Sequence, residues 1–187
     1  MRSTASSCTR PRVDGRALDV VQLRRPHPDE APTIHRLLEE ASRTEPEGRF
    51  IVDPLDVVAR HLDGPDGFTV VAGDGDLVVA AMIVRFPRDA EDNLARGLGY
   101  DDATVLAAAH IESVAVAPPY RGRGLQRALL SSVEEELVRD HVPVALATVS
   151  PDNEPSRRNF LKAGYVDLAR RKMYGGVDRI IIGKQLS

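Results

Sequence analysis

The chain has 187 residues, a formal net charge of −3 and a sequence pI near 6.0. This length suits one domain of ordinary size, and the charge excludes the broad cationic surface that non-specific nucleic-acid binding requires. The hydrophobic fraction is 42%, yet the chain has only four Phe, four Tyr and no Trp. The core must therefore be mainly aliphatic, which favours an α/β fold.

Cysteine content and hydropathy indicate which cellular compartment and which kinds of partner to expect. The single cysteine, Cys8, has no partner for a disulfide or a Cys-based metal site, so we expect a reducing cytoplasm and no metal. The longest apolar run, residues 77–84, is less than half of a bilayer span, which argues against a membrane partner. Residues 1–16 are rich in Arg and Ser and predict a disordered N-terminal extension, with a transit peptide as the alternative, before a domain at 17–187.

Apolar periodicity and turn residues predict alternating strands and helices in the first half of the chain. These elements are a strand at 17–23, a helix at 30–42, a short helix at 54–62 with Asp53 as N-cap and Pro54 at its first position, and strands at 68–72 and 77–86. Gly73-Asp74-Gly75-Asp76 separates the last two strands and predicts an antiparallel hairpin.

The second half begins with a charged segment, residues 87–104, whose length predicts a surface excursion with room for a short helix. It is our first candidate for a substrate-facing loop. The elements that follow are a strand at 105–117, a helix at 121–140, a strand at 142–149, a turn and helix at 151–162, and a hairpin of strands at 165–173 and 178–184. Gly164 stands where a left-handed helix stop is expected.

A basic, glycine-containing loop joins the strand at 105–117 to the next helix and predicts an anion site. Gly122 and Gly124 let the backbone approach a ligand, and the unpaired N–H groups and dipole of the helix start favour negative charge. Arg121, Arg123 and Arg127 add positive charge, which suits a pyrophosphate. Taken alone, the loop is equally compatible with a polar turn that caps a core helix or with an RNA-binding patch.

Two motifs in this half resemble those of the GCN5-related N-acetyltransferases. A strand ending in a Val-Ala-Val run leads to Arg121-Gly122-Arg123-Gly124-Leu125-Gln126, which matches the acetyl-CoA signature except that Gln126 replaces a small residue. About thirty residues later, Asn153 to Ser156, followed by a helix ending in Gly164-Tyr165, is similar to the second conserved region of the family. The order of elements from 17 to 184 also matches.

This resemblance implies a fold and a cofactor site. The fold is a single α/β domain whose mixed, mostly antiparallel sheet of six to seven strands is flanked by about four helices, with a splayed strand pair at the cofactor. The backbone of Val114, Ala115 and Val116 would bind the pantetheine of acetyl-CoA, and residues 121–126 (Arg121, Gly122, Arg123, Gly124, Leu125, Gln126) its pyrophosphate. Asn153 would contact the pantetheine, with Ser156 nearby, although Asn153 also suits a helix cap.

The resemblance further implies direct transfer of an acetyl group from acetyl-CoA to a primary amine of a small molecule or protein. Glu112 is the candidate general base, with a surface carboxylate as the alternative, and His110 is a second candidate on the same strand face. Many members protonate the thiolate with a tyrosine where this chain has Phe160, so water, Tyr165 or Tyr174 would have to serve. That substitution keeps open a non-catalytic acyl-CoA-binding sensor or partner module.

The sequence does not name the acceptor, which the resemblance places near residues 30–61 and 87–104. Acidic residues there hint at a cationic acceptor, although a solvated acidic surface explains them better: Glu45, Glu47, Asp89, Glu91, Asp92, Asp101 and Asp102. Dimers are common among the proteins that the chain resembles, so a homodimer is a further expectation.

Overall fold

The computed structural model describes residues 12–13, 16–17 and 21–186. Two-residue strands β1 (Arg12–Val13) and β2 (Arg16–Ala17) pair with each other. The expectation for residues 1–16 falls largely outside the described residues and stays a prediction, as does the part of the expected strand 17–23 at residues 18–20; the strand described there starts at Gln22. In the parts of the chain that are described, no helix has the length and apolar character to cross a bilayer.

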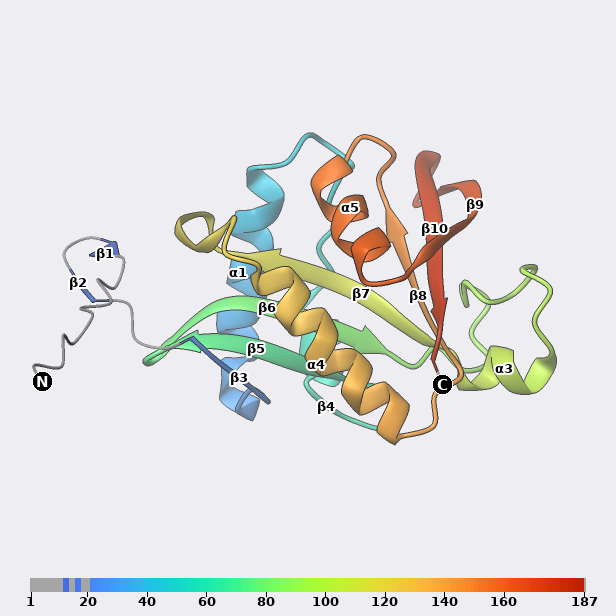
Figure 1. Ribbon diagram of the computed structural model, residues 1–187, viewed down its shortest axis with the longest axis horizontal. Helices are drawn as coiled ribbons and strands as arrows, with labels where there is room; N and C mark the ends of the chain where they lie inside the picture. Colours follow the sequence, from blue (N-terminus) through green and yellow to red (C-terminus); the bar gives the residue numbers. More distant parts are fainter. Residues whose placement is uncertain (1–11, 14–15, 18–20, 187) are drawn as a thin grey trace, which may run out of the picture.

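One mixed sheet forms the centre of the molecule (Figure 1). Its strands are β3 (Gln22–Arg24), β4 (Asp63–Gly64), β5 (Gly67–Asp74), β6 (Leu77–Arg85), β7 (Ala109–Val116), β8 (Val144–Val149), β9 (Val166–Met173) and β10 (Val177–Gln185). The order is β3-β5-β6-β7-β8-β10-β9, with β4 paired to β5. Every pair is antiparallel except β7 with β8.

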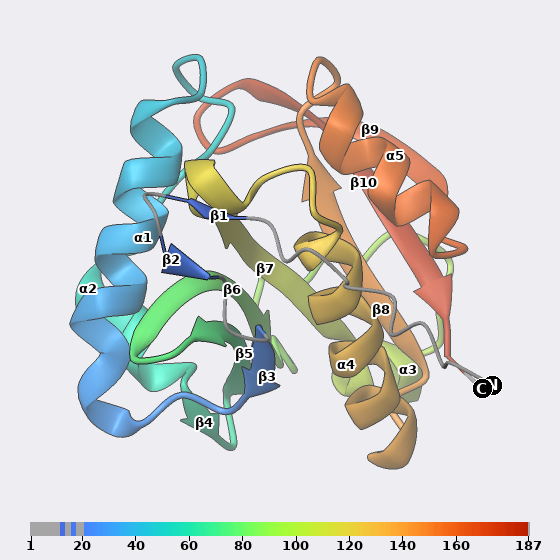
Figure 2. The same ribbon diagram turned by 60° about the vertical axis from the view of Figure 1, so that its left-hand side comes forward.

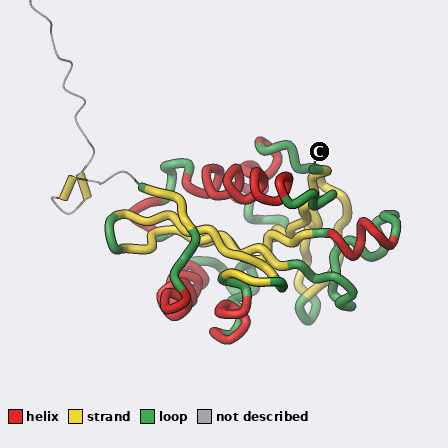
Figure 3. Tube along the Cα trace, turned by 90° about the horizontal axis from the view of Figure 1, so that it is seen from below, coloured by secondary structure: helices red, strands yellow, loops and turns green. Residues whose placement is uncertain are grey.

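Helices cover both faces of this sheet, as Figures 2 and 3 show. They are the 3₁₀ turns η1 (Pro28–Glu30) and η2 (Pro118–Tyr120) and the α-helices α1 (Ala31–Arg43), α2 (Leu55–Arg60), α3 (Asp102–Ala107), α4 (Leu125–Arg139) and α5 (Glu154–Lys162). α1 and α2 lie on one face, and α4 and α5 lie on the other. The predicted α/β fold, with its mostly antiparallel sheet, is confirmed.

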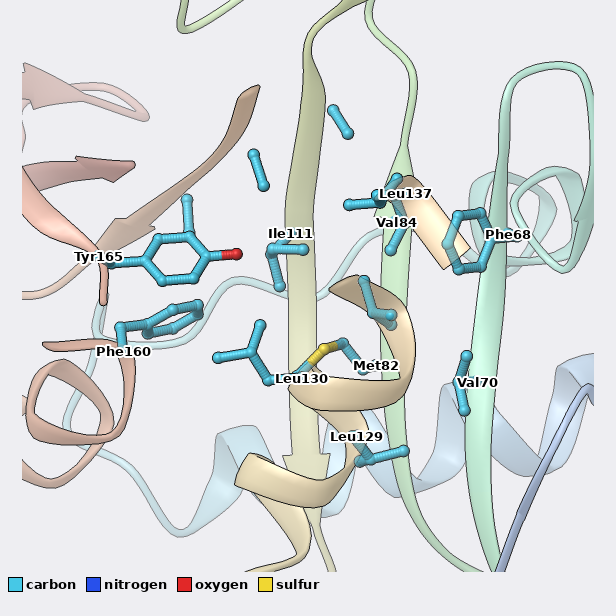
Figure 4. Close-up of a cluster of buried hydrophobic side chains, with 14 of the residues drawn as sticks. Phe68, Val70, Met82, Val84, Ile111, Leu129, Leu130, Leu137, Phe160 and Tyr165 are labelled. Carbon is cyan, nitrogen blue, oxygen red and sulfur yellow. The ribbon is translucent and has the colours of Figure 1, made fainter. Parts of the chain in front are cut away.

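The core has two main clusters, one on each face, and both are mainly aliphatic. α4 packs Leu129, Leu130 and Leu137 against β5, β6 and β7, and Figure 4 shows this cluster. On the opposite face, Ile34 and Leu38 of α1 are fully buried against the sheet. The apolar faces of the helices, which the sequence shows as periodic stripes, therefore pack against the two faces of the sheet.

The strand predicted at 105–117 is wrong over its first residues, because α3 ends at Ala107 and β7 starts at Ala109. Asp101 caps α3 by accepting a hydrogen bond of 2.7 Å from the N–H of Thr104. This cap and the alanines of the segment favour a helical turn over an extended strand.

Two predicted helix starts also differ from the structure. α4 begins at Leu125 rather than at residue 121, because Gly122 and Gly124 have φ of 75° and 80°, which a right-handed helix cannot contain. α2 begins at Leu55 and has Pro54 as its N-cap, so Asp53 does not cap it. The stop at Gly164 is confirmed, with φ of 92°.

Gly67, at the start of β5, provides a stability test. A Cβ atom at this position would overlap the backbone oxygen of Val84 on β6. We expect Gly67→Ala to lower the free energy of unfolding by about 1–3 kcal/mol or more, because strands β5 and β6 have to separate. Gly64→Ala is the control, since a Cβ there meets no atom within 4 Å. Equal melting temperatures of the two variants would contradict this assignment.

Glu30, at the start of α1, should make stability depend on pH. Its carboxylate accepts two hydrogen bonds of 2.7 Å from Arg24, which lower its pKa to about 2. Because the pKa is lowered on folding, the stabilisation is complete above about pH 4.5 and disappears as the pH falls toward 2. We expect Glu30→Gln to cost about 1–2 kcal/mol at pH 7 and almost nothing near pH 2.

Denaturant unfolding of both proteins across this pH range measures that effect. Glu39→Gln is the matched control, because Glu39 pairs with Arg43 at 3.4 Å on the exposed face of the same helix and should contribute less than about 0.5 kcal/mol. A Glu30→Gln deficit that stays constant between pH 7 and pH 2 would contradict the prediction.

Candidate functional site

Strands β7 and β8 separate at the middle of the sheet. They pair only where Ala109, His110 and Ile111 face Ala145, Leu146 and Ala147, whereas β7 continues to Val116 and β8 to Val149. The backbone groups of the two strands diverge beyond that point and are free to meet a ligand between them. The expected splayed pair is therefore present.

A β-bulge lies at the same place. Ile83 and Val84 of β6 face Ser113 and Ile111 of β7, so Glu112 has no partner in that register. A bulge bends its strand and reverses the alternation of side chains. Ile111 and Val114 accordingly pack on the α4 face, while Ala115 packs against α1. The bulge thus places Glu112 at the opening between the strands.

The predicted anion loop leads from the end of β7 into α4. The first bond within the helix runs from the N–H of Ala128 to the oxygen of Gly124, so the N–H groups of residues 124–127 precede the helical pairing. A Cβ at Gly122 or Gly124 would meet no atom within 4 Å, which leaves open space beside the backbone. This geometry supplies N–H donors and a favourable helix dipole to an anion.

The arginines around this loop do not all face the cavity. Arg121 lines it and donates to the oxygen of Val116 at 3.1 Å and to Thr44 at 2.9 Å. The guanidinium of Arg123 instead donates to the oxygen of Pro119 and lies over the ring of Tyr120. Arg127 lies on the cavity wall. Positive charge at the loop therefore comes mainly from Arg121 and Arg127.

Helix α5 forms the opposite wall and is tied to α4 by side chains. Asn153 caps α5 by accepting a 3.2 Å hydrogen bond from the N–H of Ser156. Gln126, which replaces a small residue of the motif, donates to Ser156 at 3.2 Å and accepts from Asn159 at 2.8 Å. Its side chain points toward α5, so it joins the two helices and leaves the loop backbone uncovered.

These elements surround one cavity of about 590 Å³. Its wall includes every candidate residue that the sequence analysis named for the cofactor and base except Arg123 and His110: Glu112, Val114, Ala115, Val116, Arg121, Gly122, Gly124, Leu125, Gln126, Asn153 and Ser156. The cavity passes through the opening between β7 and β8, because it also touches Thr148, Tyr174 and Arg179 on the far side. It connects the anion loop to Glu112.

Glu112 is held by a short chain of polar contacts. The backbone N–H of Leu94 donates to Nε2 of buried His110 at 3.1 Å, so a neutral His110 carries its proton on Nδ1. That nitrogen lies 3.7 Å from Oε2 of Glu112. His110 thus lies beside Glu112 while its Nε2 accepts the hydrogen bond from Leu94.

The surroundings keep Glu112 ionised. Burial alone would raise its pKa, but the contact with His110 and the charge of Arg85 outweigh burial and hold the pKa below its usual value. Nearby Asp53 has a raised pKa, caused by burial and by the charge of Glu112. Burial lowers the pKa of His61, which keeps that side chain neutral. Glu112 is thus a carboxylate able to accept a proton at neutral pH.

The aromatic residues near the site have different positions. Phe160 lines the cavity from α5, whereas Tyr165 is 1% exposed in the core beside it (Figure 4). Tyr174, at the β9–β10 turn, lines the cavity on the Glu112 side and its hydroxyl is 3.3 Å from Oγ1 of Thr148. Burial raises the pKa of Tyr174, so its hydroxyl stays protonated. Of the two tyrosines that the sequence analysis considered for the thiolate, Tyr174 is therefore the one that lines the cavity; Tyr120 also lines it, but its hydroxyl donates to Asp74 at 2.7 Å.

Sequence reasoning missed part of the wall. Thr148 and Arg179 come from β8 and β10, where the sequence predicts ordinary strands. In the sequence, Arg179 stands directly before three isoleucines, and this charged residue next to an apolar run was the signal available for it.

The acidic residues that hinted at a cationic acceptor are partly engaged within the protein, since Glu45 pairs with Arg49 and Asp92 with Arg85. Within the described ranges, no group of three or more His, Cys, Asp or Glu side chains is arranged to hold a metal ion.

Solved structures with the same fold come from several organisms. The ribosomal-protein-S18-alanine N-acetyltransferase of Escherichia coli is 18% identical, with a TM-score of 0.68, over 90% of this chain and 95% of that chain. The ribosomal-protein-alanine N-acetyltransferase of Brucella melitensis is 21% identical, with a TM-score of 0.69, over 88% and 99%. NAA60 of Arabidopsis thaliana in complex with acetyl-CoA is 16% identical, with a TM-score of 0.72, over 89% and 99%.

No curated protein sequence matches the chain at a significant level. The model of the acetyltransferase (GNAT) family matches residues 32–165, which is more than half of the chain and includes both motifs, the bulge and the opening between β7 and β8. The chain therefore belongs to the acetyltransferase (GNAT) family.

Proposed function

We propose that the protein transfers an acetyl group from acetyl-CoA to a primary amine of a small molecule or protein, by direct transfer in a ternary complex. The observation that carries this proposal is the cavity between the separated strands, which connects the anion loop to an ionised carboxylate. The solved structure of NAA60 with acetyl-CoA, which shares the fold, supports the choice of donor.

The residues of the cavity suit the parts of acetyl-CoA. The N–H groups that open α4, with Arg121, would bind the pyrophosphate. The separated edge of β7, from Val114 to Val116, would pair with the amides of pantetheine. Asn153 caps α5 with its carbonyl oxygen and lines the cavity, so its amide nitrogen is available to the same arm. The thioester would then lie near Glu112.

Transfer requires a neutral amine, because an ammonium has no lone pair to attack the thioester carbon. With an ordinary amine pKa of about 10.4, neutralising it at pH 7 costs about 4.6 kcal/mol. Glu112 would accept that proton, directly or through one water, before the neutral nitrogen attacks the thioester carbon. The nitrogen then loses a second proton to solvent as the amide forms. A backbone N–H of β7 near Val114 would stabilise the oxyanion that forms.

The carbon–sulfur bond then breaks and the sulfur leaves with the bonding electrons. A thiol has a pKa of about 8.5, so the thiolate is a competent leaving group and takes its proton from water or from a nearby hydroxyl. Phe160 supplies no hydroxyl, while Tyr174 keeps its proton and lines the same cavity. Tyr174 is accordingly the protein group best suited to that step.

Phe160 also favours a second candidate, a module that binds acyl-CoA without transfer. Calorimetry with coenzyme A, followed by a thiol-release assay with acetyl-CoA and a panel of primary amines, separates the two functions. Binding together with amine-dependent thiol release supports the transferase. Binding without release on any amine supports the module, and absence of binding removes both.

A further inference from the structure

The side of the cavity that faces Glu112 contains a buried cation. Arg179 of β10 is 3% exposed and forms part of the cavity wall. Its Nη2 donates to the backbone oxygens of Gly48 at 2.6 Å and Arg49 at 3.3 Å, whereas its buried Nη1 has no hydrogen-bond partner. None of the ion pairs among the described residues involves Arg179. Such a charge is costly to bury unless an anion pairs with it.

The pyrophosphate of the cofactor does not meet this need, because Arg179 lies on the other face of the sheet. Alternate residues of a strand share a face, and Ile181 packs with Val144 and Leu146, away from α4. Thr148 of β8 follows those two residues on the same face. The anion that Arg179 would bind therefore enters from the side opposite to the loop at Gly122 and Gly124.

Tyr174 lies between Arg179 and Glu112 on this side. Its ring centre is 5.4 Å from the guanidinium carbon of Arg179, and the ring is 49% exposed at the turn of the hairpin. The charges of Glu112 and Arg179 act on the Tyr174 hydroxyl in opposite directions. The wall thus has a negative end at Glu112 and a positive end at Arg179.

We propose that the acceptor is an amine that also bears a carboxylate, with the amine at Glu112 and the carboxylate on Arg179. This inference rests on the proposed function and specifies its substrate class. Opposite charges at the two ends of the wall complement an ammonium and a carboxylate in one molecule. The free Nη1 of Arg179 has N–H groups to donate to the carboxylate, and such a charge-assisted hydrogen bond is stronger than a neutral one. A free amino acid and a peptide with an acidic side chain near its N-terminus both have this chemistry.

Matched acceptors test the proposal. The thiol-release assay would make two comparisons. The first set compares free amino acids with their carboxamides. The second set compares short peptide amides that have glutamate as second residue with those that have glutamine there. We expect kcat/KM to favour the carboxylate of one such pair by about 10- to 100-fold, the usual effect of one charged hydrogen-bonded contact. A preference within the first set identifies a free amino acid, and a preference within the second identifies an acidic peptide.

Two arginine variants show whether Arg179 causes the preference. In Arg179→Met, the ratio of kcat/KM for the carboxylate acceptor to kcat/KM for its amide should fall to about one, while the Kd of coenzyme A stays the same. Arg171→Met is the matched control, because Arg171 faces Arg179 in the β9–β10 register and also holds loop carbonyls, those of Arg96 at 3.4 Å and Gly97 at 3.1 Å. The carboxylate-over-amide ratio of kcat/KM in Arg171→Met should equal that of the unaltered protein.

The outcomes separate this proposal from the proposed function. Two results would overturn the role of Arg179 and leave the transferase intact. One is acetylation of amines with no preference for carboxylates. The other is an Arg179→Met variant whose kcat/KM falls equally on all acceptors, so that the carboxylate-over-amide ratio stays the same. Calorimetry of N-acetyl amino acids and their amides against the protein saturated with coenzyme A gives an answer even without turnover. Binding that needs both the carboxylate and Arg179 supports the site, and absence of such binding overturns it.

Discussion

Replacing Glu112 with glutamine is expected to lower kcat/KM for acetyl transfer by about 10²- to 10⁴-fold at pH 7, the range for loss of one general base. The variant keeps the size of the side chain in the bulge of β7 and removes only its ability to accept a proton. The Kd of coenzyme A should not change, because the groups that suit the cofactor are the β7 edge from Val114 to Val116 and the starts of α4 and α5. Calorimetry measures the Kd of coenzyme A, and thiol release measures kcat/KM.

The pH dependence of that loss is a sharper test. Because the pKa of Glu112 lies below its usual value, the carboxylate is ionised at every pH from 6 to 9 and can accept the proton of an ammonium throughout this range. We therefore expect kcat/KM of the unaltered protein to change little with pH, whereas kcat/KM of Glu112→Gln should rise as the amine loses its proton. The deficit of Glu112→Gln should narrow as the pH approaches the pKa of the amine, since more of the acceptor is already neutral.

Glu135→Gln is the control for Glu112→Gln, because it makes the same substitution on the exposed face of α4, outside the cavity. It should have little effect on the rate. A Glu112→Gln enzyme with an unaltered rate and pH profile would remove Glu112 from the mechanism.

Replacing Gly124 with valine is expected to weaken coenzyme A binding by about 10- to 100-fold, since one or more charged hydrogen bonds would be lost. Gly124 has φ of 80°, a conformation that a β-branched residue rarely adopts. The loop would therefore rearrange, and its N–H groups would no longer converge on the pyrophosphate. Calorimetry with coenzyme A measures the change.

Gly75→Val separates this effect from general strain. Gly75 has φ of 59° in the β5–β6 turn, and a Cβ there also meets no atom within 4 Å. Both variants should lose stability, but only Gly124→Val should lose affinity. Equal affinities would show that the opening of α4 does not hold the cofactor.

Local patterns of the sequence predicted most of the secondary structure. The helical stripes of α1 and α4 and the turn between β5 and β6 depend on residues close together in the chain, so periodicity and turn chemistry revealed them. The start of β7 was predicted incorrectly, since the cap at Asp101 competes with a run of residues that also suits a strand. Such competition between two local preferences leaves the boundary to tertiary packing.

By itself the sequence determined the glycine loop at the start of α4, the position of Glu112 on the strand before it, and a family resemblance based on two motifs. Only the tertiary structure decided that β7 bulges at Glu112 and parts from β8, that His110 lies beside this carboxylate, that Arg123 turns away from the cavity, and that Arg179 is buried in the cavity wall. Strand register and side-chain burial depend on contacts between distant segments, and these form only when the two layers of helices close on the sheet.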